Sequence, residues 1–165
     1  MTTQAPAIRG GARLWVGTVV RLALAAVWFA AAASKITDLA ASGRAVHAYE
    51  LTPYEVSTLI GAILPFLELA LALLLLVGLA TRLTAVVSAG LLVVFIAGLA
   101  SAWARGLSID CGCFGEGGQL AAGEDPQYGL DLARDVAFLA LAGFLVLFPA
   151  TRLSVDRWLE RGGRD

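Results

Sequence analysis

Long apolar runs separated by short polar segments dominate the chain. A helix needs roughly 20 predominantly apolar residues to cross a bilayer, and the run from Leu83 to Ala104 meets this length without a single charged residue. Three further runs are interrupted by few charges. Because a backbone inside lipid must satisfy its own hydrogen bonds, each run is expected to be α-helical. The predicted spans are about 14–34, 56–80, 83–104 and 130–150.

The segments between these runs predict the topology. The Thr81–Arg82 turn is too short for anything but an antiparallel hairpin. Residues 35–54 mix charge with apolar residues at helical spacing, which predicts a short helix in the membrane interface. Residues 105–129 are rich in glycine and acid and are expected to be irregular. The chain is therefore predicted to be an all-α membrane protein, an antiparallel bundle of four transmembrane helices. The boundaries are a four-helix domain over 14–150 and mobile tails over 1–13 and 151–165.

Composition agrees with a membrane environment. The chain is 59% hydrophobic and 15% charged, whereas a soluble domain is charged at about a quarter of its positions. The net charge of −1 gives no support for a nucleic-acid partner. Membrane lipid is thus the expected surrounding, and association of the chain into homo-oligomers is left open.

The distribution of lysine and arginine predicts the orientation, because cytoplasmic flanks carry the excess of positive charge. One side has seven such residues and the other has four. Both termini are therefore expected in the cytoplasm, and the cysteine loop 105–129 on the outer face of the plasma membrane. The seven are Arg9, Arg13, Arg82, Arg152, Arg157, Arg161 and Arg164, and the four are Lys35, Arg44, Arg105 and Arg134.

The first apolar run has an alternative interpretation. Arg9 and Arg13, the apolar stretch and then Ala31–Ala33 resemble a signal peptide with a small-residue cleavage site. The stretch is long for a signal peptide, and cleavage would leave the other three helices without their partner. A retained first span is the favoured interpretation.

The strongest candidates for a reactive site are Cys111 and Cys113, the only two cysteines of the chain. Separated by one residue, they can close only a tight ring, and strain makes a disulfide easier to reduce. Gly112 supplies the backbone freedom that closure requires. In an oxidising compartment this pattern predicts a redox-active dithiol. The alternatives are an inert local bridge, unpaired thiols, or a metal site with His47 and an acid, although the spacing is not that of a zinc motif.

Two ionisable residues fall well inside the first two predicted spans, where such groups usually have a function. Arg21 lies in the first span and Glu68 in the second. At 1.5 Å per residue their depths differ by roughly 6 Å, within reach of an arginine side chain. Two interpretations are open: a buried ion pair that docks the two helices, or a polar floor for a quinone or a proton path.

More charges lie near the predicted outer surface. Arg134 opens the fourth span beneath the cysteine loop, and a nearby cation favours the reactive thiolate form of cysteine. Asp135 is expected to neutralise Arg134 in part, and Asp110 flanks the first cysteine. Lys35 ends the first span, where it either supports the same site or reaches toward lipid headgroups.

The run Asp110–Gly115 after a long apolar helix resembles the methylamine utilisation MauE family, within the DoxX-like membrane proteins. The resemblance extends over Leu14–Pro149, nearly the whole chain. Supporting matches, in order, are Ser34–Lys35, Ala45–Tyr49 followed by Pro53, Pro65–Leu69, Thr81–Arg82 and Arg134–Asp135.

The resemblance implies a four-helix membrane bundle linked to extracytoplasmic thiol–disulfide chemistry. MauE proteins are thought to act with a thioredoxin-like partner when disulfides form during maturation of methylamine dehydrogenase. Carried onto this chain, the redox role falls on Cys111 and Cys113. Methylamine itself does not follow from the residues.

Three functions of different classes are then compared. The leading hypothesis is a membrane thiol–disulfide oxidoreductase component that exchanges its cysteine pair with a thioredoxin-like partner. Its electrons go either to a bound quinone or to a second protein. The rival is a non-catalytic scaffold subunit of an oxidoreductase or quinol-oxidising complex. A small transporter using Arg21 and Glu68 is disfavoured, since no internal repeat is detectable.

Overall fold

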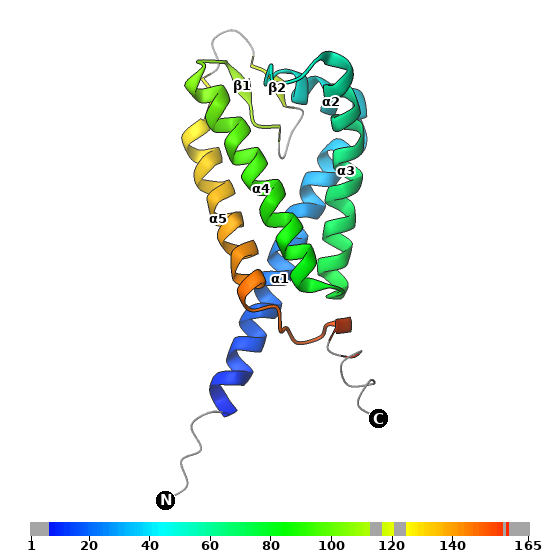
Figure 1. Cartoon of the computed structure of the whole chain (residues 1–165), viewed down its shortest axis with the longest axis vertical. Helices are drawn as coiled ribbons and strands as arrows, with labels where there is room; N and C mark the ends of the chain where they lie inside the picture. Colours follow the sequence, from blue (N-terminus) through cyan, green and yellow to red (C-terminus); the bar gives the residue numbers. More distant parts are fainter. Residues whose placement is uncertain (1–6, 113–116, 121–124, 157, 159–165) are drawn as a thin grey trace, which may run out of the picture.

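A computed structural model describes residues 7–112, 117–120, 125–156 and 158 of the chain. Within these residues it is all-α apart from one small two-stranded ladder (Figure 1). We call the end of the bundle formed by α2, β1 and β2 the cysteine end. The opposite end, which we call the base, comprises residues 78–80 and 149–156. The elements are α1 (Ala7–Lys35), α2 (Leu39–His47), α3 (Tyr54–Val77), α4 (Thr81–Ala104), β1 (Ile109–Asp110), β2 (Gly118–Gln119) and α5 (Tyr128–Leu147).

Three of the predicted spans are confirmed as long apolar helices. Among the described residues, Gly11–Lys35, Tyr54–Val77 and Thr81–Ala104 are long and apolar enough to cross a membrane. The chain is thus a multi-pass membrane protein. The helix α5 also forms where a span is predicted, but its first two turns carry three charged residues. It packs along α4 and contacts α1 (Figure 1).

The hairpin between α3 and α4 lies slightly earlier than predicted. The helix α3 ends at Val77, and Gly78 takes the left-handed conformation (φ +69°) that commonly ends helices. Thr81 and Arg82, predicted to form the turn, are instead the first two residues of α4. The last helix also ends early, at Leu147, because Pro149 disfavours helical geometry at the residue before it.

The short helix expected in the first long connection is confirmed as α2. Asp38 begins it by accepting a hydrogen bond from the Ala41 amide (2.8 Å), as an N-cap residue does. The helix lies against α3 at a very close approach of the two backbones. A Cβ atom on Gly61 would lie only 2.4 Å from the amide nitrogen of Gly43. The absence of side chains at these two glycines therefore allows α2 to dock.

The cysteine loop is less irregular than predicted. Ile109 pairs with Gln119 and Asp110 with Gly118 in an antiparallel register. Tyr128 holds the ladder from below, because its hydroxyl donates to the Leu107 carbonyl and accepts from the Ile109 amide. Two residues per strand give no alternating pattern long enough to be recognised in a sequence.

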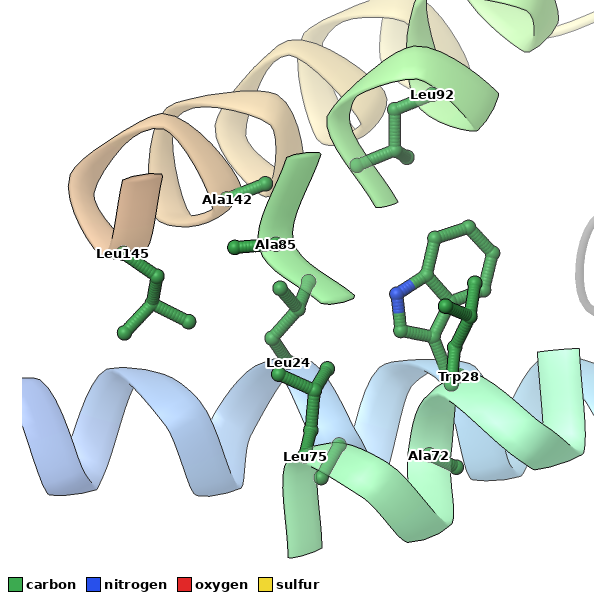
Figure 2. Packing of buried hydrophobic residues seen from close by; sticks show 10 residues of the cluster. Leu24, Trp28, Ala72, Leu75, Ala85, Leu92, Ala142 and Leu145 are labelled. Atoms are coloured by element: carbon green, nitrogen blue, oxygen red, sulfur yellow. The ribbon is translucent and has the colours of Figure 1, made fainter. Parts of the chain in front are cut away.

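Apolar side chains from four helices meet in the middle of the bundle (Figure 2). In lipid, helices associate by close packing and interhelical hydrogen bonds more than by the hydrophobic effect. Trp28 provides both, since it is 2% exposed and its indole nitrogen donates to Ser88 Oγ at 3.0 Å. The other labelled members of the cluster are Leu24, Ala72, Leu75, Ala85, Leu92, Ala142 and Leu145.

The interpretation of Arg21 and Glu68 as a buried ion pair is wrong. The guanidinium of Arg21 is buried at the base, where it donates to the carbonyl oxygens of Leu75 (2.7 Å), Leu76 (3.2 Å) and Leu153 (3.0 Å). Leu75 lies seven residues beyond Glu68 along α3, which is about 10 Å at the rise of an α-helix. Arg21 therefore joins α1 to the end of α3 and to the segment after α5.

The segment after residue 150, predicted to be a mobile tail, is packed across the base in its described part. Asp156 accepts hydrogen bonds from the amides of Ala80 (2.7 Å) and Thr81 (2.8 Å), so it caps the start of α4. The Arg152 amide donates to Thr18 Oγ1 at 2.8 Å. The segment thus ties α1 to the start of α4, where Asp156 satisfies amides that a helix start leaves unpaired.

The close approach of α2 and α3 gives a first prediction. Gly61→Ala should destabilise the protein by about 1–3 kcal/mol, because the new methyl group overlaps the Gly43 backbone. Gly90→Ala in α4 is the matched control, since its Cβ would meet no atom within 4 Å. Alanine at position 90 should be neutral or slightly stabilising. Resistance of the purified protein to unfolding by SDS measures both, and equal resistance of the two variants would contradict the packing.

Candidate redox site at the cysteine end

Cys111 follows β1 directly and lies beneath the surface of the cysteine end. Its side chain is buried at 8% exposure, in a small cluster with Leu99, Ile109 and Tyr128. Its carbonyl oxygen accepts a hydrogen bond from the Tyr49 hydroxyl at 2.8 Å. The position of this cysteine is therefore set by the segment just after α2, by α4 and by α5 together.

The two arms of the cysteine loop touch each other on α2. Gly112 (φ +68°) and Gly117 (φ +57°) both take left-handed conformations. A Cβ atom on Gly117 would lie 2.6 Å from the Gly112 Cα and 2.8 Å from the Ala45 Cβ. Gly112 was singled out in the sequence, whereas Gly117 and Ala45 were not, because close approach across a loop leaves no local signal.

The sulfur of Cys111 is disulfide-bonded in this structure. Cys113, its expected partner and the other cysteine of the chain, lies outside the described residues. The described contacts of the site are therefore those around Cys111.

Arg134 brings a positive charge to the sulfur. Its Nη2 lies 3.4 Å from Cys111 Sγ, as a hydrogen-bond donor. The side chain is 29% exposed and reaches the sulfur from the second turn of α5. A guanidinium in this place stabilises negative charge on the sulfur, the charge that a thiolate carries.

Two carboxylates hold the guanidinium in place. Asp131 Oδ1 lies 2.9 Å from Arg134 Nη1, and Asp135 Oδ1 lies 3.2 Å from Nε and Nη2. Among the described residues the second oxygen of Asp135 is buried without a hydrogen-bond partner. Asp131 was missed in the sequence, although its spacing of three residues from Arg134 on a helix was the signal that it shares the same face.

Tyr49 is a second residue that the sequence did not single out as part of the site. Arg105 donates from Nη2 to the Tyr49 carbonyl at 2.5 Å, which anchors the end of α2 to α4. Burial, followed by the nearby carboxylates of Asp135, Asp110 and Asp131, raises the pKa of Tyr49 above its usual value. The phenol therefore stays protonated at neutral pH and remains a donor to the Cys111 carbonyl.

Lys35 is the buried partner of Glu68. Its Nζ lies 2.8 and 3.0 Å from the two carboxylate oxygens, and the side chains are 7% and 0% exposed. The interpretation that Lys35 reaches toward lipid headgroups is therefore wrong. Helical side chains point back toward the N-terminus of their own helix, so a lysine at the last position of α1 reaches down into the bundle and meets α3.

The remaining sequence candidates lie at the periphery. Asp110 is exposed in the ladder beside Gly118. His47 is exposed too, with its ring against Tyr54 and its Nδ1 3.5 Å from Ser57 Oγ. In the part of the chain that the structure describes, no three His, Cys, Asp or Glu side chains are grouped to hold a metal ion.

The contact between Arg134 and Cys111 gives a second prediction. In a reduced Cys113→Ser background, Arg134→Gln should move the pH midpoint of Cys111 alkylation upward by roughly one unit, because the thiolate loses its neighbouring cation. Arg44→Gln is the control, an exposed cation at the same end of the bundle whose carboxylate partner is Asp38. The midpoint is obtained from the alkylation rate of the Cys111 peptide, measured by mass spectrometry at a series of pH values. An unchanged midpoint in Arg134→Gln would show that the guanidinium does not stabilise the Cys111 thiolate.

The buried ion pair gives a third prediction. Lys35→Met leaves Glu68 without its cation and should cost about 3–5 kcal/mol in the free energy of unfolding. The double variant Lys35→Met/Glu68→Leu should recover most of that loss, because no buried charge remains. SDS titration of the purified variants gives the comparison. A double variant no more stable than the single one would show that the pair acts through packing instead of charge.

Comparison with known proteins agrees with the resemblance noted in the sequence. No curated protein and no solved structure matches the chain. A family model described as methylamine utilisation protein MauE matches residues 13–148, from α1 to just past the end of α5. The chain therefore belongs to the MauE family.

Proposed function

We propose that the chain is the membrane component of an extracytoplasmic thiol–disulfide redox system, and that Cys111 and Cys113 form its redox-active disulfide. The observation that carries the proposal is the 3.4 Å contact from the Arg134 guanidinium to Cys111 Sγ. An inert bridge has no need for a cation at its sulfur, whereas a sulfur that becomes a thiolate is stabilised by one.

In the proposed arrangement α5 is the fourth span and both termini are cytoplasmic. The excess of lysine and arginine in the segments flanking the base supports this orientation. The charged residues of α5 are compatible with a fourth span, since Arg134 pairs with both Asp131 and Asp135 near the cysteine end. The cysteine loop is then on the oxidising side of the membrane, where disulfides persist.

The reaction is a disulfide exchange with a thioredoxin-like partner. A thiolate of the partner attacks Cys113 and forms a mixed disulfide, while the electron pair of the broken S–S bond goes to Cys111. Arg134 stabilises that leaving thiolate, and a better-stabilised leaving group departs faster. The second thiol of the partner then releases Cys113, so the partner is oxidised and this chain holds two reduced cysteines.

The family description names methylamine utilisation and no thiol chemistry, and the proposal accounts for that description without a methylamine site. Exchange of disulfides would serve methylamine utilisation through the maturation of another protein. We therefore assign the substrate as a dithiol protein, and methylamine is not bound under this proposal.

The fourth prediction separates the two cysteines. With a single-cysteine variant of a thioredoxin-like protein, activated as its mixed disulfide with thionitrobenzoate, Cys111→Ser should accumulate a protein–protein disulfide at Cys113. The Cys113 thiolate displaces thionitrobenzoate, and no second thiol in either protein resolves the product. Cys113→Ser should accumulate at least tenfold less, since its remaining sulfur is buried at 8% exposure. The adducts are counted by non-reducing electrophoresis and mass spectrometry, and both single variants should lose turnover.

A redox titration in intact membranes, with mass-tagged alkylation of the cysteines, tests whether the pair is redox-active. Reversible titration at a relatively oxidising potential is expected of a working pair. Thiols that stay reduced throughout, or turnover retained in both single variants, would exclude the exchange. The chain would then be assigned as a non-catalytic scaffold subunit of an oxidoreductase or quinol-oxidising complex.

A further inference from the structure

An apolar cavity of about 310 Å³ lies directly beside Cys111. Its size is at the lower end of the range for small-molecule sites. The walls come from α3, through Ile60 and Leu64, and from α4, through Val94 and Phe95. Cys111 and Gly112 line it on the side of the cysteine loop. The cavity therefore extends from the interior of the bundle to Cys111, which the proposed exchange reduces.

The cavity opens sideways, between α3 and α4. Ile60 and Val94, which line it, are 40% and 64% exposed, and both belong to helices long and apolar enough to span the membrane. The two helices are joined at the base and lie apart toward the cysteine end (Figure 1). An apolar molecule dissolved in the bilayer can thus enter without crossing water.

Lys35 is the single cation that lines this cavity among the described residues. It also lines a neighbouring polar cleft of about 70 Å³, together with Thr37 and Asp38, which are exposed. Its ammonium group lies on the buried carboxylate of Glu68. The ion pair is therefore placed between the surface of the cysteine end and the apolar interior.

Reduction of the disulfide leaves two electrons that must be removed. The chain has two cysteines in all, so it has no second pair to receive them. An acceptor that reaches Cys111 through this cavity must be apolar, membrane-soluble and able to take two electrons with two protons.

We propose that the cavity binds the head group of a lipid-soluble quinone, which reoxidises the Cys111–Cys113 pair; this rests on the proposed exchange function. Two thiols become one disulfide and release two electrons and two protons, and the quinone takes both to become a quinol. Lys35 donates a hydrogen bond to a quinone carbonyl oxygen, and the polar cleft beside it exchanges protons with the outside. The quinone tail leaves between α3 and α4 into the lipid.

The test uses the full chain in lipid nanodiscs and decylubiquinone as the probe. Binding of decylubiquinone is measured by equilibrium dialysis, and reoxidation of the reduced pair is followed without oxygen by mass-tagged alkylation. Val94→Trp obstructs the opening of the cavity between α3 and α4, and it should weaken binding at least tenfold and slow reoxidation accordingly. The matched control is Val93→Trp on the same helix, since Val93 is 51% exposed and does not line the cavity; it should bind and react as the wild type does.

The outcomes distinguish this inference from the function on which it rests. If the wild type exchanges thiols with the partner but neither binds nor is oxidised by decylubiquinone, the quinone site is overturned and the exchange function stands. Equal binding in the two tryptophan variants would overturn the site as well. Displacement of the probe by decanol as readily as by a second quinone would assign the cavity to a lipid chain. Failure of the wild type to exchange thiols would instead overturn the proposed function.

Discussion

The constraint on which the whole structure depends is that a charge inside a membrane bundle must find its partner there. Unpaired charges in such surroundings are costly, and water is not at hand to relieve them. The chain meets this requirement with three arrangements at different depths. Arg21 is satisfied by carbonyl groups at the base. Lys35 and Glu68 join α1 to α3, and Arg134 lies between carboxylates and a sulfur at the cysteine end. The first two arrangements also fix which helices are neighbours, and the third joins α5 to the cysteine loop.

The long helices could be predicted from the sequence, because apolar runs of the length of a membrane span are a strong local signal. The short helix α2 could be predicted as well, but from a different local signal, the helical spacing of its apolar residues. The partner of Glu68 could not. Depth estimates along two helices compare positions of Cα atoms, whereas Lys35 reaches its partner with a side chain directed back along its own helix.

Other parts of the site depend on contacts that no local pattern contains. Gly117 matters because Gly112 and Ala45 lie against it, and these positions come from different parts of the chain. The two residues of each strand in the β1–β2 ladder are too few to give a period. The segment after α5 looked like a polar tail, yet Asp156 in it caps the start of α4. Each of these contacts is long-range, and each needs the folded bundle to exist.

The two ends of the bundle are built differently, and this has a mechanical consequence. At the base, α3 is joined to α4 by three residues, and Asp156 and Arg21 tie both helices to the last described segment and to α1. Toward the cysteine end the same two helices lie apart, with an apolar cavity between them. The two helices are thus held together at the base and are free of each other toward the cysteine end. Any widening of the gap between α3 and α4 therefore has its pivot at the base and its largest displacement beside Cys111.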